Sequence, residues 1–199
     1  MSVQDVLARI AEIQTGLIPP GPPSAAGGAA AAFSQLLQAA GSTAAAPPAS
    51  AVPAGTGGSA LLAAVQGEVG VAEQPPGSND APRIAQYRQA TAGSGVGPWC
   101  AYFTSWAARE AGMPLGDNGQ GFGSVDALYG WAQQNGRAVP NGPGVVPRPG
   151  DLVVWDEHIG VVESVSPDGS VQTIEGNSSD QVSRRTHAAD SALGYVRMG

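Results

Sequence analysis

The pattern of apolar and polar positions divides the second part of the chain into helices followed by strands. Apolar residues recur every three or four positions in four segments after residue 60, which predicts helices there. Beyond Pro140 the apolar period shortens to two, as in half-buried strands, and Pro167-Asp168-Gly169 has the residues of a hairpin turn. Helices followed by antiparallel strands predict an α+β domain over residues 61–199. The predicted helices are Leu61–Gly70, Arg83–Ala90, Trp99–Ala111 and Val125–Gln134, and the predicted strands are Asp151–Trp155, His158–Ser166, Ser170–Glu175 and Leu193–Met198.

The first part of the chain has a different pattern. Residues 1–18 carry one apolar stripe at helical spacing, ended by Gly16 and the Pro19-Pro20 pair, which predicts an amphipathic helix. This helix would pack on its own domain or dock on a partner. Residues 19–60 consist mainly of Ala, Gly, Pro and Ser, a composition that cannot bury enough surface to offset the entropy of ordering. We therefore expect a largely disordered N-terminal linker, with one short helical island around Phe33.

Composition and charge exclude several classes of protein. The net charge is −7, and all nine basic residues are arginine, so the chain lacks the basic stripe that nucleic-acid binding or a polybasic membrane anchor would need. No apolar run reaches the ~18–20 residues that cross a bilayer. Asp5, Arg9 and Glu12 interrupt the start of the chain, which therefore lacks the pattern of a cleavable signal peptide.

The single cysteine, Cys100, is the first candidate for chemistry. One cysteine cannot form an internal disulfide or a multi-thiolate zinc site. It is either a small buried apolar residue or a nucleophile served by a distant histidine. Its predicted place at the start of the Trp99–Ala111 helix favours a reactive thiolate, because unpaired N–H groups and the helix dipole put positive potential there.

Two later strands add a histidine and polar partners for it. A lone histidine in a strand, such as His158, is most often structural, and His187 in its polar segment is interpreted in the same way. Glu175 and Asn177, however, follow on the next predicted strand, where either could orient the imidazole of His158. A cysteine at a helix start, a histidine on a strand and a polar residue beside it form a papain-like arrangement.

These residues and their flanks resemble the CHAP domain, the cysteine, histidine-dependent amidohydrolase/peptidase family of peptidoglycan hydrolases. The resemblance covers about residues 67–196 and rests on EQPPGSND, GPWCAYFTSWAAREAGM, RPGDLVVWDEHIGVVESV, the IEGNSSDQVSRR run and a closing GYVR. It implies an α+β, papain-like (NlpC/P60-related) domain with N-terminal helices packed on an antiparallel sheet. It also implies that Cys100 is the nucleophile and His158 the base, and that Glu175 and Asn177 complete the catalytic site.

The resemblance further implies a reaction. The Cys100 thiolate would attack an amide carbonyl of peptidoglycan, either as an N-acetylmuramoyl-L-alanine amidase or as an endopeptidase of the stem or cross-bridge. Asn79, Trp99 and Trp155 are candidates for binding the substrate, although both tryptophans could equally be core residues. Asp80, Asp117 and Asn118 do not make a calcium-ligand series, so we expect no metal and no other cofactor. A second enzyme interpretation is the related NlpC/P60 group, which shares the papain-like core but usually has His or another polar residue as its third catalytic residue instead of the Glu-Gly-Asn segment.

The N-terminal segment suggests where such an enzyme would act. Residues 1–40 loosely resemble the N-terminal parts of flagellar rod- and hook-associated proteins, which implies a wall hydrolase tethered to flagellar rod assembly. A phage endolysin is the competing context, and a non-catalytic, wall-binding assembly protein is the alternative of a different class. We expect action at the bacterial cell wall or periplasm by an export route that the sequence does not show.

Overall fold

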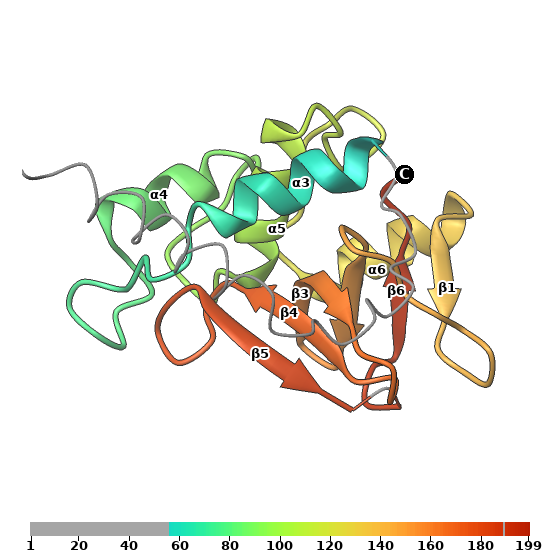
Figure 1. Ribbon diagram of the computed structural model, residues 1–199. Helices are drawn as coiled ribbons and strands as arrows, with labels where there is room; N and C mark the ends of the chain where they lie inside the picture. Colours follow the sequence, from blue (N-terminus) through green and yellow to red (C-terminus); the bar gives the residue numbers. More distant parts are fainter. Residues whose placement is uncertain (1–55, 189) are drawn as a thin grey trace, which may run out of the picture. The chain divides into compact units, whose positions relative to one another are not determined.

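A computed structural model describes residues 56–188 and 190–199 of the chain. Within these residues four helices precede a sheet of six strands (Figure 1). The helices are α3 (Thr56–Gln66), α4 (Pro82–Arg88), α5 (Cys100–Glu110) and α6 (Val125–Gln134), and the strands are β1 (Ala138–Pro140), β2 (Leu152–Trp155), β3 (His158–Val165), β4 (Val171–Glu175), β5 (Ser183–His187) and β6 (Gly194–Val196).

The strands form one antiparallel sheet in the order β1-β6-β2-β3-β4-β5. Strands β2 and β3 are joined by two residues, Asp156 and Glu157, and β3 and β4 by the predicted turn at Pro167-Asp168-Gly169. The short strand β1 lies at one edge and the polar strand β5 at the other. Strands β2 to β5 therefore form an antiparallel meander, whereas β6, the last strand of the chain, lies between β1 and β2 and pairs with both.

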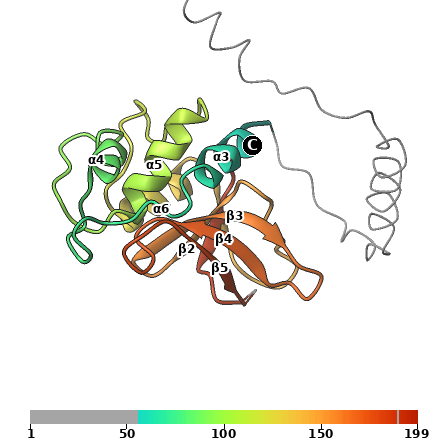
Figure 2. The same cartoon turned by 60° about the vertical axis from the view of Figure 1, so that its left-hand side comes forward.

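Helices α3 and α5 pack against β3, and α4 packs against α5, so that these three helices lie on one side of the sheet (Figures 1 and 2). Alternate residues of the strands face opposite sides of the sheet and belong to two different apolar clusters. Leu152, Val154 and Val161 join the helices in the main core, whereas Val153 and Val162 belong to a smaller cluster with Tyr195. Every residue of α5 from Cys100 to Ala108 is buried, because the helix is covered by its neighbouring helices and by the sheet.

The structure confirms the predicted α+β order and the helices and strands expected after residue 60, with small shifts of their ends. Helix α3 begins at Thr56, ahead of the expected domain start at residue 61. Strands β1 and β5 were not predicted, because neither has an alternating apolar pattern. The expected amphipathic helix at 1–18, most of the linker at 19–60 and the helix around Phe33 lie outside the described residues.

Candidate active site

Cys100 is the first residue of α5, and two features of the fold set its position. Trp99 precedes it as N-cap but caps no backbone N–H of the helix with its side chain. One turn further on, Phe103 packs against Gly176 just after β4, where an added Cβ would lie 2.6 Å from the Phe103 Cβ. The absence of a side chain at Gly176 therefore lets the start of α5 approach the end of β4.

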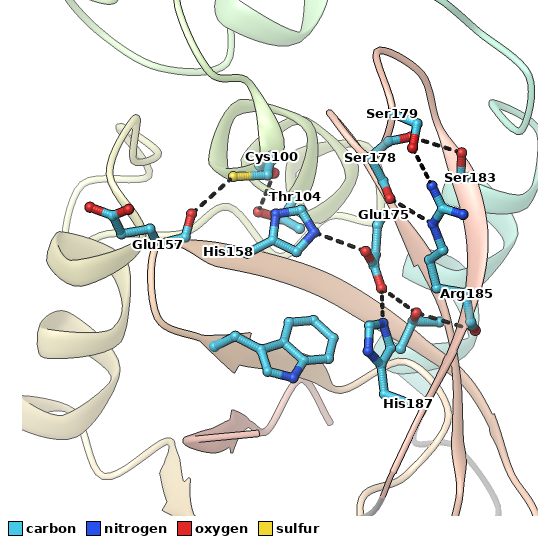
Figure 3. Close-up of polar contacts among 12 residues, drawn as sticks. Cys100, Thr104, Glu157, His158, Glu175, Ser178, Ser179, Ser183, Arg185 and His187 are labelled. Carbon is cyan, nitrogen blue, oxygen red and sulfur yellow. Dashed lines mark hydrogen bonds and ion pairs between the residues drawn. The ribbon is translucent and has the colours of Figure 1, made fainter. Parts of the chain in front are cut away.

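His158 begins β3 immediately after the two-residue turn from β2. The turn residue Glu157 has a φ of 57°, a left-handed conformation that is uncommon for a residue with a side chain. Its carbonyl oxygen lies 4.0 Å from the Cys100 sulfur, so the turn brings the start of β3 to the nucleophile candidate. Figure 3 shows one side of the His158 ring facing the Cys100 sulfur, while Nε2 on the other side points to Glu175.

Glu175, the last residue of β4, reaches His158 across the backbone of the neighbouring strand. Val162 of β3 is paired with Thr173 of β4, so His158 and Glu175 lie on the same face by strand alternation. Gly160 lies between them, and a Cβ there would be 2.6 Å from the Glu175 Cγ. The Glu175 carboxylate Oε2 is 2.9 Å from His158 Nε2. Gly160 thus provides the space through which the carboxylate reaches the imidazole.

The second oxygen of the same carboxylate has two further partners (Figure 3). Oε1 of Glu175 accepts a hydrogen bond from the Thr173 hydroxyl at 2.5 Å and lies 2.6 Å from Nε2 of His187. Glu175 is buried with 2% exposure, and these contacts offset the cost of burying its charge. Sequence reasoning missed both partners of Oε1. The Thr173-x-Glu175 spacing could have indicated that Thr173 shares a strand face with Glu175, but no comparable signal pointed to His187.

The surroundings set the charges of the two central groups. Burial lowers the pKa of His158, but hydrogen bonds and negative charges from Cys100 and Glu175 raise it, so that the pKa of His158 is about 9. Burial raises the pKa of Glu175, whereas hydrogen bonds from His158, Thr173 and His187 lower it, to about 2. At neutral pH the imidazole is therefore protonated between an ionised carboxylate and the cysteine.

A cleft of about 420 Å³ opens beside Cys100, and its lining includes Glu157 but neither His158 nor Glu175. The start of α6, where the Ser124 hydroxyl caps the Ala127 N–H, forms part of its wall. Two exposed carboxylates, Asp126 and Glu157, lie along the cleft, and none of its lining residues is basic. Sequence reasoning did not find this wall, because its residues come from three separate segments. The cleft is lined by Pro98, Cys100, Tyr102, Gly123, Ser124, Val125, Asp126 and Glu157.

The three residues that the sequence suggested for substrate binding are not among those that line the cleft. Trp99 is fully buried, and its indole N–H donates to Glu73 Oε1 at 2.9 Å, so it supports Cys100 from within the core and does not line the cleft. Asn79 donates its backbone N–H to the other oxygen of Glu73. Trp155 packs against the rings of His158 and His187.

Asn177 lies beyond the end of β4, with a φ of 58°. Strand alternation from Glu175 therefore does not extend to it. Its side chain makes no hydrogen bond with another described residue, so the structure brings Cys100, His158 and Glu175 together without showing a contact for Asn177.

Two properties of the described part of the chain bear on function. Among residues 56–188 and 190–199, no group of three or more His, Cys, Asp or Glu side chains is arranged to hold a metal ion. None of the helices within these ranges combines the length and the apolar character needed to cross a membrane.

Comparison with protein families gives one match, to the CHAP domain, over residues 91–177. Comparisons with curated proteins and with solved structures gave no match. The CHAP domain implies a papain-like fold, and the helices and antiparallel sheet described above agree with it. It supports a hydrolase of the amidase or peptidase kind that acts on cell-wall peptidoglycan. Residues 91–177, which carry Cys100, His158 and Glu175, therefore belong to the CHAP domain family.

Proposed function

We propose that the chain hydrolyses an amide bond in the stem peptide or cross-bridge of peptidoglycan, with Cys100 as nucleophile and His158 as general acid and base. The observation that carries the proposal is that the His158 ring faces the Cys100 sulfur on one side (Figure 3), while its Nε2 lies 2.9 Å from the Glu175 carboxylate on the other. A protonated imidazole beside a cysteine stabilises the thiolate, which is the nucleophilic form. The cleft that Cys100 lines supplies room for an extended polymer substrate.

The reaction follows from these positions. The Cys100 thiolate adds to the amide carbonyl carbon, and the negative charge moves to the carbonyl oxygen, near the uncapped N–H groups at the start of α5. The C–N bond then breaks as His158 gives its proton to the departing amine, which leaves a thioester on Cys100. Water adds to the thioester carbon while His158 takes its proton. The C–S bond then breaks, which releases the product acid and regenerates the Cys100 thiolate beside the protonated His158.

Glu175 is proposed to orient His158 and to stabilise its protonated state, as a carboxylate does in other triads. Asn177 remains a proposed member of the site on the strength of the sequence resemblance alone. Trp155 has a supporting place beside the two histidines, and Asn79 is connected to the core under Cys100 through Glu73.

Mass spectrometry of purified peptidoglycan digested with the full chain tests this proposal. New fragments from the wild-type chain and none from Cys100→Ala are expected. Free stem peptides that begin with L-alanine would identify an N-acetylmuramoyl-L-alanine amidase, and split stems or bridges would identify an endopeptidase. Fragments from both chains would remove Cys100 from the mechanism. Binding without fragments from either chain would favour the non-catalytic, wall-binding alternative.

The biological setting is a separate proposal, which rests on residues 1–40 outside the described part of the chain. We propose that this segment binds a flagellar rod partner, with a phage lysis enzyme as the alternative. Retention of the full chain, but not of residues 56–199, by isolated flagellar basal bodies would support the first. Equal retention of both would contradict it. The fragment begins at residue 56 because α3 begins there.

A further inference from the structure

The Glu175 carboxylate is shared by two histidines. Its Oε2 is 2.9 Å from Nε2 of His158, and its Oε1 is 2.6 Å from Nε2 of His187. His187 is the last residue of β5, beyond the residues that match the family, and it comes from the edge of the sheet rather than from the strand next to His158. The contact therefore reaches the proposed site from a segment outside the family match.

The chemistry of the carboxylate fixes the direction of these hydrogen bonds. An ionised carboxylate only accepts, so each imidazole must present an Nε2–H to it, and the Thr173 hydroxyl must donate as well. Glu175 thus receives one donor on Oε2 and two on Oε1. A carboxylate held at both oxygens cannot rotate about its terminal bond without losing hydrogen bonds in a buried place, which is costly.

Trp155 holds the two imidazoles in a fixed relation. Its ring lies 5.8 Å from the His158 ring at an interplanar angle of 27°, and 4.3 Å from the His187 ring at 44°. The indole N–H donates to the Ser191 hydroxyl at 3.2 Å, which anchors the tryptophan in turn. Both ring contacts restrict the histidines to the positions from which they meet Glu175.

We propose that His187 is a positioning residue that holds the Glu175 carboxylate so that Oε2 faces His158. The proposal rests on the function proposed above, in which Glu175 orients the base. His187 is not among the residues that line the cleft beside Cys100, so it acts through Glu175 and not on substrate. Its loss should reduce kcat and leave KM nearly unchanged, because ground-state binding of the polymer does not involve it.

The expected loss of rate on substitution of His187 depends on which hydrogen bonds to Glu175 remain. In metal sites, loss of the outer hydrogen-bonding layer around a histidine typically costs about 10- to 100-fold in activity or affinity. Thr173 still donates to Oε1 when His187 is gone, so we expect about tenfold for His187→Leu, the lower end of that range. His187→Gln should restore most of the loss, because its side-chain amide can donate to Oε1 in place of Nε2–H.

The experiment measures two rates on the full chain: alkylation of Cys100 by iodoacetamide, and release of peptidoglycan fragments. Alkylation reports the thiolate paired with His158 and needs no natural substrate, so it tests His187 even if the chain releases no fragments. Absence of fragments would reject the proposed hydrolysis, whereas the alkylation rates would still test the positioning role of His187. The expected order in both rates is wild type, then His187→Gln close behind, then His187→Leu about tenfold slower.

Arg184→Leu serves as the matched control, because Arg184 is on the same strand but the opposite face and pairs with Glu163. It should alkylate at the wild-type rate. Equal alkylation of His187→Leu and wild type would overturn the proposal, as would a faster rate in His187→Leu. A loss in Arg184→Leu equal to that in His187→Leu would also overturn it, because disturbance of β5 alone would then explain the effect.

A measurement on the unmodified chain covers the case in which His187→Leu does not fold. Nitrogen-15 NMR of the histidine rings distinguishes the two neutral tautomers. The proposal requires a proton on Nε2 of His187, held against exchange by Glu175. A His187 ring protonated on Nδ1 alone would have no donor for Oε1 and would overturn the proposal.

Discussion

Gly160 and Glu175 lie on neighbouring strands so close together that the glutamate side chain passes where a Cβ of residue 160 would be. We therefore expect Gly160→Ala to move the Glu175 carboxylate away from His158. A misplacement of about 1 Å in an active site can cost on the order of 10²-fold in rate, so hydrolysis should fall by about that factor. Overpacking should lower the free energy of unfolding by about 1–3 kcal/mol.

Fragment release and urea unfolding measured side by side test this prediction. Gly130→Ala is the control, since Gly130 lies in α6 with no atom within 4 Å of the place that an alanine Cβ would take, and alanine there should stabilise the helix by about 0.5–1 kcal/mol. Wild-type activity in Gly160→Ala would show that the reach of Glu175 to His158 does not depend on this space.

Gly176→Ala should displace Cys100, the proposed nucleophile, instead of the contact between Glu175 and His158. Its Cβ would meet Cβ of Phe103, an atom fixed to the backbone of α5, so the helix itself must shift. We expect losses of both activity and stability, with the stability loss of about 1–3 kcal/mol at least as large as in Gly160→Ala. Gly67→Ala, with its nearest atom at 3.7 Å, should leave both unchanged. Full activity in Gly176→Ala would contradict the close approach of α5 to β4 as a requirement.

The dependence of stability on pH should have a defined shape. The pKa of His158 is raised from 6.5 to about 9 in the folded state, so its contribution is complete below pH 6.5 and is lost as the pH rises through 9. The pKa of Glu175 is lowered from 4.5 to about 2, so its contribution is complete above pH 4.5 and is lost as the pH falls through 2. Both contributions are complete between pH 4.5 and 6.5.

Urea unfolding of wild type and His158→Gln across the pH range checks this shape. The difference in unfolding free energy between the two should shrink as the pH rises from 6.5 to 9. A difference that grows over this interval would mean that the folded state favours the neutral imidazole.

The β2–β3 turn offers a prediction about stability alone. A left-handed conformation costs a residue with a side chain roughly 1–2 kcal/mol, and glycine avoids this cost but loses more entropy on folding. Glu157→Gly should therefore raise the free energy of unfolding slightly, by at most about 1 kcal/mol. Asp156→Gly, at the neighbouring position without a left-handed φ, should lower it. The same sign for both substitutions in thermal unfolding would refute the conformational explanation.

Helix α3 belongs to the folded unit although it begins ahead of the expected domain start. Leu61 and Val65 are fully buried in the main core. A fragment of residues 67–199 lacks both side chains, and loss of one buried leucine alone costs about 2–5 kcal/mol. We expect residues 56–199 to unfold cooperatively in urea and residues 67–199 to be much less stable or unfolded. Equal midpoints for the two fragments would show that α3 does not contribute to this core.

The sequence predicted the central elements well and the edges of the sheet poorly, for a physical reason. Strands such as β2 and β3 bury residues on one or both faces, which leaves a readable apolar pattern. The edge strands β1 and β5 carry little buried surface, and SRRTH in β5 shows no alternation at all. His187 was missed for the same reason, because its partner Glu175 is found only once β5 is paired with β4.

The residues of the candidate site could be predicted where local sequence patterns or the resemblance to the CHAP family identify them. Cys100 at a helix start and His158 at a strand start follow from local patterns, and Glu175 follows from strand pairing. Extending the strand places Asn177 on the same side as Glu175, but β4 ends at Glu175. The cleft wall at Ser124 and Asp126 depends on how α6 lies against α5, which no local pattern encodes.

The complete burial of α5 from Cys100 to Ala108 determines how this part of the protein can unfold. Local opening requires a segment with few buried contacts, and the buried part of α5 that begins with Cys100 is not such a segment. Backbone amides in the middle of α5 should therefore exchange with solvent only when the whole domain unfolds. On heating, loss of catalytic competence should coincide with that global transition and should not precede it, so that an inactive but folded intermediate does not accumulate.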